Sequence, residues 1–165
     1  MFKPRYLDWY RYDVRKTIIQ LEDYLYGKTS YEGYCSGIYI YYEMHKDEEE
    51  FIFGLNVYDY LESYNNLNCL NDHFDIRGYH ALHDHMKLML LLVKYLYKNN
   101  YCSDSCIKDY EELSGNTLIL RNKITKCIIS QKYLDIVSWL EQLKSKEKET
   151  LENILKELIK KHKHF

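Results

Sequence analysis

Histidine and aspartate side chains are concentrated in one short segment, residues 75–98, which reads DIRGYHALHDHMKLMLLLVKYLYK. His80, His83 and Asp84 are separated by three and one residues, so a helix would bring all three onto one face. Two imidazoles and a carboxylate are suitable ligands for a divalent ion such as Zn²⁺ or Fe²⁺. The spacing therefore predicts either a metal site at the start of a helix or a polar network in the same place.

Arg77 and Tyr79 stand just ahead of these histidines. A guanidinium can bind a carboxylate or phosphate through two parallel hydrogen bonds, and an ion pair with a nearby acidic residue is the alternative for Arg77. Tyr and Arg are also the residue types that carry much of the binding energy at protein interfaces. We therefore expect a binding surface made of Arg77, Tyr79, His80, His83 and Asp84.

Cysteine chemistry is a second possibility. Cys35, in the segment GYCSG, is a candidate nucleophile if the fold brings an imidazole beside it. Cys102 and Cys106 stand four residues apart, a spacing that suits a disulfide, half of a zinc site, or two ordinary thiols. No GxSxG, P-loop, GxGxxG, HEXXH or paired CxxC motif is present. The candidate enzymes are a metal-dependent hydrolase and a cysteine-dependent acyltransferase, and we favour a protein without its own catalysis over both.

The composition limits the classes of partner and the cellular compartment that we expect for this protein. The chain has 165 residues, with 23 basic and 25 acidic side chains and a net charge of −2, so it lacks the basic footprint of a nucleic-acid-binding protein. Its five cysteines are odd in number and irregularly spaced, which favours reduced thiols in the cytoplasm. The longest apolar run is too short to cross a bilayer. We expect a cytoplasmic protein that binds neither nucleic acid nor membrane, and its oligomeric state is left open.

Tyrosine is unusually frequent, with 19 Tyr against 5 Phe and 2 Trp. Each tyrosine that is buried needs a hydrogen-bond partner for its hydroxyl or a route to water. An AT-rich coding sequence explains the excess without any function, and a tyrosine-lined ligand groove is the functional alternative.

The histidines must be positioned by a helix, which we predict over residues 79–98. Apolar residues spaced by four, three and four positions predict another helix over residues 8–26. Asp8 is its expected N-cap and Gly27 its expected stop. The segment 51–64 also has a helical pattern, in which Gly54 predicts a close packing contact.

Two further regions complete the prediction. Residues 37–44, GIYIYYEM, suit either a short strand or a buried helix. A helix beginning near Ser103 and Asp104 is followed by a long apolar stripe over residues 134–158. That stripe pauses at KSKEKET, where Glu147 and its neighbours read as a solvated face. We expect one all-α domain over residues 1–165, an irregular bundle of five or six helices.

Three stretches, residues 53–64, 75–96 and 118–155, resemble the helical C-terminal part of butirosin biosynthesis protein H-like proteins. These proteins are relatives of the papain-like cysteine peptidases. The resemblance covers roughly residues 50–160 and rests on the order of the patterns. Family chemistry is acyl transfer or peptide-type hydrolysis by a Cys/His pair in an N-terminal half that this chain lacks. The resemblance therefore implies a helical recognition or accessory module and transfers no catalytic residue.

We predict a non-catalytic binding or accessory module whose ligand is a protein, or a peptide-like or carrier-bound molecule. No cofactor is expected unless His80, His83 and Asp84 hold Zn or Fe. The enzymes named above are the first alternative. A viral or phage protein that blocks a host factor by helix-in-groove contact is the second.

Overall fold

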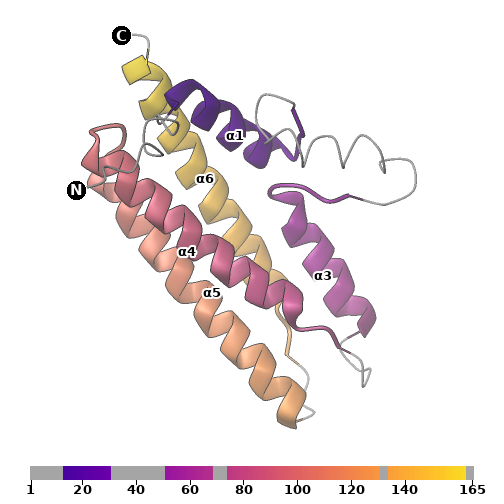
Figure 1. Ribbon diagram of the computed structural model, residues 1–165. Helices are drawn as coiled ribbons and strands as arrows, with labels where there is room; N and C mark the ends of the chain where they lie inside the picture. Colours follow the sequence, from indigo (N-terminus) through magenta and orange to yellow (C-terminus); the bar gives the residue numbers. More distant parts are fainter. Residues whose placement is uncertain (1–12, 31–50, 69–73, 131–133, 163–165) are drawn as a thin grey trace, which may run out of the picture.

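Five helices form the part of the chain that the computed structural model describes, which is residues 13–30, 51–68, 74–130 and 134–162. No strand occurs in these ranges, so the predicted all-α fold is confirmed. The possible strand over residues 37–44 lies outside them. The helices, drawn in Figure 1, are α1 (Val14–Tyr26), α3 (Asn56–Asn68), α4 (Arg77–Lys98), α5 (Asp104–Ser130) and α6 (Val137–His162).

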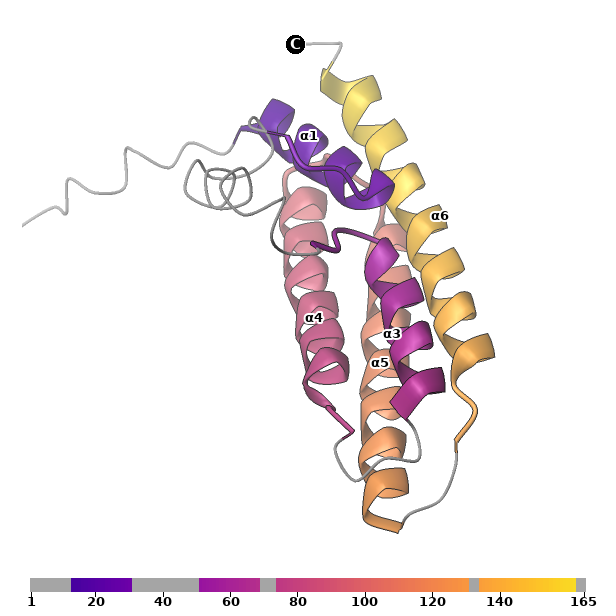
Figure 2. The ribbon, with the colours of Figure 1, turned by 90° about the vertical axis from the view of Figure 1, so that its right-hand side faces the viewer.

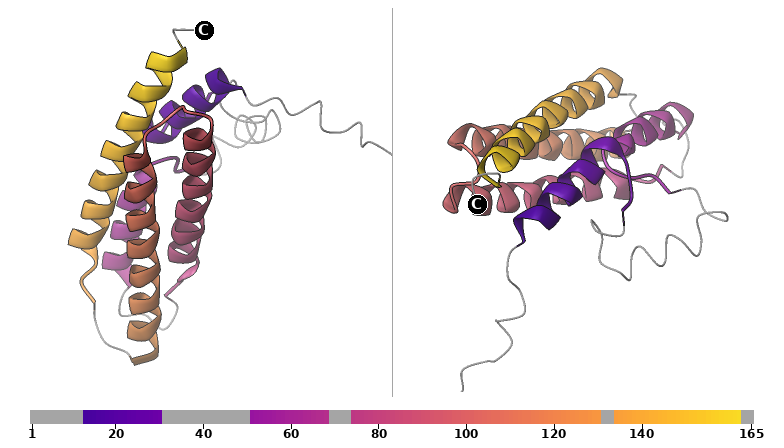
Figure 3. Two further views of the ribbon diagram at one scale, coloured as in Figure 1. Left: turned by 90° about the vertical axis from the view of Figure 1, so that its left-hand side faces the viewer. Right: turned by 90° about the horizontal axis from the view of Figure 1, so that it is seen from above.

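The three long helices α4, α5 and α6 set the long axis of the bundle (Figure 1). α4 and α5 are antiparallel neighbours joined by a short turn, and α6 packs against α5. α6 also contacts both shorter helices: α1 crosses it near the C-terminal end, and α3 runs along its first half, as Figures 2 and 3 show. α6 therefore packs against α1, α3 and α5, whereas α4 packs mainly against α5.

The C-terminal end of α1 is where the sequence predicts it, but its N-cap is Asp13 and not the predicted Asp8. The Asp13 side chain caps the helix by accepting a hydrogen bond from the Lys16 amide at 3.2 Å. Gly27 ends the helix in the left-handed conformation, with φ of +61°, as predicted. The predicted start near Asp8 is therefore wrong, because the extended backbone of Asp13 ends the helix there.

Gly54 makes the predicted close contact, but it does so ahead of the helix and not inside it. α3 begins at Asn56, and Gly54 has φ of +61° in the preceding turn. A Cβ at this position would lie 1.9 Å from the carbonyl oxygen of Tyr24, so only glycine fits. The next amide, that of Leu55, donates to the same oxygen at 3.1 Å and fixes the start of α3 against the end of α1.

α6 is one continuous helix through the polar turn where its apolar stripe pauses. Glu147 and Thr150, both in that turn, are buried in the bundle. The prediction of a solvated face at Glu147 is therefore wrong. Leucines and isoleucines on both sides of the turn join the same core, so the second half of α6 packs against the bundle as the first half does.

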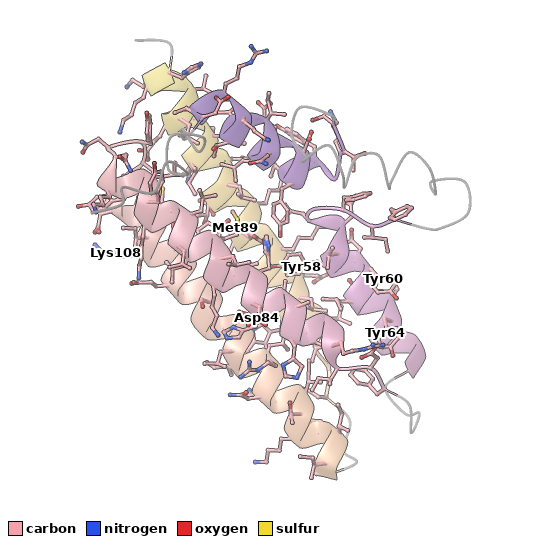
Figure 4. All side chains as sticks on the ribbon, in the orientation of Figure 1. Tyr58, Tyr60, Tyr64, Asp84, Met89 and Lys108 are labelled. Atoms are coloured by element: carbon pink, nitrogen blue, oxygen red, sulfur yellow. The ribbon has the colours of Figure 1, made fainter. Side chains whose placement is uncertain are left out.

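The core draws apolar side chains from all five helices. Three tyrosines are among its largest fully buried members, namely Tyr58, Tyr79 and Tyr110. Tyr58 lies on the inner side of α3 and Tyr60 on its outer side (Figure 4). None of the described helices is long and apolar enough to cross a membrane.

Candidate functional site

The residues predicted to hold a metal point in different directions from α4. His80 and Asp84 are exposed, whereas His83 is 2% exposed and its Nδ1 lies 3.2 Å from the hydroxyl of Thr117 on α5. Asp84 pairs instead with Lys87, one turn along the helix, at 3.7 Å. Although the three residues are close in sequence, His80 and Asp84 face solvent and His83 faces α5.

The structure does not gather these side chains into a ligand set. Within the described ranges, no group of three or more His, Cys, Asp or Glu side chains could hold a metal ion. Burial lowers the pKa of His83 below its ordinary value, and the charges of Lys87 and Arg121 lower it further. A neutral imidazole that packs against Thr117 acts as a core residue, which corrects the expectation of a Zn or Fe site at His80, His83 and Asp84.

The predicted binding surface also needs correction at two of its five positions. Tyr79 is 1% exposed and its hydroxyl donates to the Leu61 carbonyl oxygen at 3.3 Å, so neither Tyr79 nor His83 can touch a partner. Arg77 is exposed but forms an ion pair with Asp75 at 2.7 Å, the alternative considered for it. This pairing lowers the pKa of Asp75, mainly through the side-chain hydrogen bond from Arg77.

An exposed apolar row lies one to three turns further along α4. Leu88, Leu91 and Tyr95 are 65%, 63% and 43% exposed. Their spacing of three and four residues places them on one outer face, which we call the α4 stripe. Single exposed leucines are common on proteins, but a row of large apolar residues on one helix face is typical of an interaction surface.

One edge of the α4 stripe is basic. Lys87, Lys94 and Lys98 are spaced by seven and four residues, so they share the side of α4 that lies next to the stripe. Lys87 pairs with Asp84 at 3.7 Å, and Lys94 pairs with Glu111 of α5 at 2.9 Å. Exposed pairs of this kind contribute little free energy, so the lysines can exchange partners when another acidic surface approaches.

A second polar cluster lies inside the bundle, where each of the five helices contributes one side chain. Its centre is the carboxylate of Glu147 on α6, which is 0% exposed. The Tyr58 hydroxyl donates to Oε2 at 2.8 Å and the Tyr24 hydroxyl donates to Oε1 at 3.2 Å. His85 and Tyr110 complete what we call the Glu147 centre.

His85 and Tyr110 face Glu147 less directly. His85 Nε2 lies 3.7 Å from Glu147 Oε1, and its ring stacks on Tyr24 with centroids 4.7 Å apart. Within the described residues, His85 Nε2 and the Tyr110 hydroxyl are buried atoms without a well-formed hydrogen bond. Burial raises the pKa of Tyr58 and of Tyr110, and the nearby charge of Glu147 raises both further. The tyrosines are therefore neutral hydroxyl donors.

The Glu147 centre has the composition of a structural network. A buried carboxylate is tolerated only when hydrogen bonds or charges compensate its lost hydration. Here the donors come from α1 and α3, which binds these two short helices to α6. The sequence does hold a signal for it: Glu147 stands four residues after Leu143 and four before Leu151, at a position where the stripe of α6 requires an apolar residue.

A scan against protein-family models, a search of curated proteins and a search of solved structures each found no match. The resemblance to butirosin biosynthesis protein H-like proteins therefore stays a prediction. Cys35, the candidate nucleophile, lies outside the described residues.

Proposed function

We propose that the protein is a non-catalytic binding module that docks a partner protein on the outer face of α4. The observation that carries this proposal is the α4 stripe of Leu88, Leu91 and Tyr95. It lies on a rigid helix whose opposite side is packed into the core through Met86, Met89 and other residues. A rigid helix face loses little conformational entropy when a partner binds it.

The spacing of the stripe suits contact with another helix. Residues at positions i, i+3 and i+7 are the usual anchors by which one helix packs on a helix or in a groove. Two leucines and a tyrosine provide an apolar centre, and the lysines beside them provide a charged rim. This division into apolar centre and polar rim is the normal anatomy of a protein interface.

The basic edge indicates the kind of partner. Lys87, Lys94 and Lys98 all lie on one side of the stripe, so an occupant with acidic residues along one edge would match them in charge. We therefore propose an amphipathic helix of another protein, apolar on one face and rich in Asp or Glu beside it. We also propose that the protein binds neither nucleic acid nor membrane and that it acts as an accessory to its partner.

The test places a photo-crosslinking amino acid at Leu91 in cells that make the protein. We expect crosslinking to one protein through an acidic amphipathic helix, identified by peptide mapping. Purified partner should then bind the natural chain, and the double substitution Leu88→Lys/Leu91→Lys should weaken binding by at least about tenfold, because each buried leucine anchor contributes more than about 1 kcal/mol.

The matched control is Ile128→Lys/Ile129→Lys, which changes two exposed isoleucines on α5 by the same chemistry. It should leave binding unchanged, and circular dichroism should show both variants folded. The proposal is overturned if the crosslink joins two copies of this chain, if no crosslink forms, or if both double variants weaken binding equally.

A further inference from the structure

His85 of α4 is a half-buried histidine whose Nε2 atom is turned into the bundle. That atom is buried, accepts or donates no hydrogen bond among the described residues, and lies 3.7 Å from Oε1 of the fully buried Glu147. The His85 side chain as a whole is 32% exposed, so its ring can exchange a proton with water. The Glu147 centre therefore contains an imidazole, the side chain that ordinarily titrates near neutral pH, within reach of solvent.

The groups that the other helices direct toward this pair are neutral hydroxyls. Tyr24 of α1 stacks on the His85 ring with centroids 4.7 Å apart and donates to Oε1 of Glu147 at 3.2 Å. Tyr58 of α3 donates to Oε2 at 2.8 Å. Burial and the charge of Glu147 raise the pKa of Tyr110 of α5, so its hydroxyl also keeps its proton.

The charged residues near Glu147 and His85 in sequence have partners at or near the surface. These ion pairs are Lys144–Asp59, Lys146–Asp109 and Lys87–Asp84. The lysines of α6 are thus directed toward acidic residues of α3 and α5. An imidazolium at His85 is the cation that the geometry places opposite the buried carboxylate.

A proton on His85 strengthens two contacts at once. It places a charged N–H group opposite Glu147, and charge-assisted hydrogen bonds are about twice as strong as neutral ones. The same charge is attracted to the face of the Tyr24 ring on which His85 stacks. Tyr24 belongs to the short helix α1, which otherwise packs on α6. Both contacts therefore act on the attachment of α1 to the bundle.

We propose that His85 and Glu147 act as a pH-sensitive switch that controls how firmly α1 packs on the bundle. At low pH the imidazolium pairs with Glu147 and attracts Tyr24, and α1 is held. At high pH the neutral ring leaves the carboxylate without a cation, and α1 separates from the bundle more often. Because these contacts require the bound proton, the stabilisation is present at low pH and is lost as pH rises through the range, near about 6.5, in which histidines titrate.

The first test is urea denaturation of the full chain, followed by circular dichroism at about pH 5.5 and about pH 8.5, on either side of that range. His85→Gln keeps a neutral amide in place of the ring. It should raise the unfolding equilibrium constant at least about fivefold more at the lower pH, because only there does it remove a hydrogen bond to a charged group. The matched control is His80→Gln, which changes an exposed histidine of the same helix and should act equally at both pH values.

The second test asks whether Glu147 and α1 are involved. In a Glu147→Gln background, the pH dependence of the His85→Gln effect should disappear. Hydrogen–deuterium exchange, corrected for the intrinsic effect of pH, should show that α1 loses more protection than α5 at the higher pH in the natural chain, and that His85→Gln abolishes this difference. The exchange experiment decides the question if Glu147→Gln does not fold.

Three results would overturn the proposal. The first is an equal effect of His85→Gln at both pH values, or an equal pH dependence for His80→Gln. The second is a pH dependence that persists in the Glu147→Gln background. The third is a loss of protection at high pH that is the same in α1 and α5, which would indicate a general change in stability and no switch at α1.

Discussion

Two glutamates of α6, Glu147 and Glu157, accept hydrogen bonds from other parts of the chain but lie in very different surroundings. Glu147 is fully buried, and tyrosine hydroxyls from α1 and α3 donate to it. Glu157 is half-buried, and the Ser103 hydroxyl, from the turn before α5, donates to it, with the Cys106 thiol nearby. The first carboxylate joins helices that are distant in sequence, and the second positions a single turn.

The difference in depth separates a contact on which the fold depends from one whose loss it tolerates. At full burial, the loss of one hydrogen-bond partner leaves a polar group that water cannot reach, so the network contributes strongly to stability and tolerates little change. Near the surface, water replaces a lost partner, so the same kind of group can be altered with little cost.

The largest effect should come from Glu147→Ala. This change removes the acceptor for Tyr24 and Tyr58 and leaves a cavity beside them, so we expect a loss of about 3–5 kcal/mol in the free energy of unfolding. Urea denaturation followed by circular dichroism measures it. The control is Glu149→Ala, two residues along α6 and exposed, which should change stability by less than about 0.5 kcal/mol. Equal effects of the two variants would show that Glu147 does not hold the helices together.

A smaller and more discriminating effect should separate two tyrosines of the Glu147 centre. Tyr58→Phe removes a hydroxyl that donates to a carboxylate at 2.8 Å, so it should lower the free energy of unfolding by about 1.5–3 kcal/mol. Tyr110→Phe removes a buried hydroxyl without a well-formed bond, so stability should stay equal or rise by about 1 kcal/mol. The same denaturation experiment compares the two, and a larger loss for Tyr110→Phe than for Tyr58→Phe would refute this account of the centre.

The helices were largely predictable because their signals are local. Gly27 ends α1 where predicted, and the apolar spacing located α4 to within two residues of its start at Arg77. The predicted start of α3 was wrong because Gly54 packs against the backbone of Tyr24, which is distant in sequence. A pattern within one segment cannot show which carbonyl from another segment will approach it.

The site was predicted less well, for the same reason. His83 and Asp84 share a helix turn, but the position of α5 decides that His83 is buried beside Thr117 and Asp84 is not. Glu147 looked solvated beside other charged residues, although its place in the apolar stripe of α6 was readable. The tyrosines that donate to it come from other helices, and no spacing in the sequence predicts these hydrogen bonds.

The smallest effect on stability, and the sharpest on reactivity, should come from Glu157→Gln. The side chain is half-buried, so its loss of charge should change the free energy of unfolding by less than about 1 kcal/mol. The charge of Glu157 opposes ionisation of Cys106, so its removal should lower the pKa of that thiol further below about 6. Because the thiolate exists above this pKa and is lost as pH falls through it, the variant should react faster with iodoacetamide under mildly acidic conditions. The rate is followed against pH in the full chain with Cys35→Ser, Cys69→Ser and Cys127→Ser, which retains only Cys102 and Cys106, and Glu149→Gln is the control. A shift to higher pH, or an equal shift in the control, would mean that Glu157 does not act on the thiol and that the contrast with Glu147 lies in burial alone.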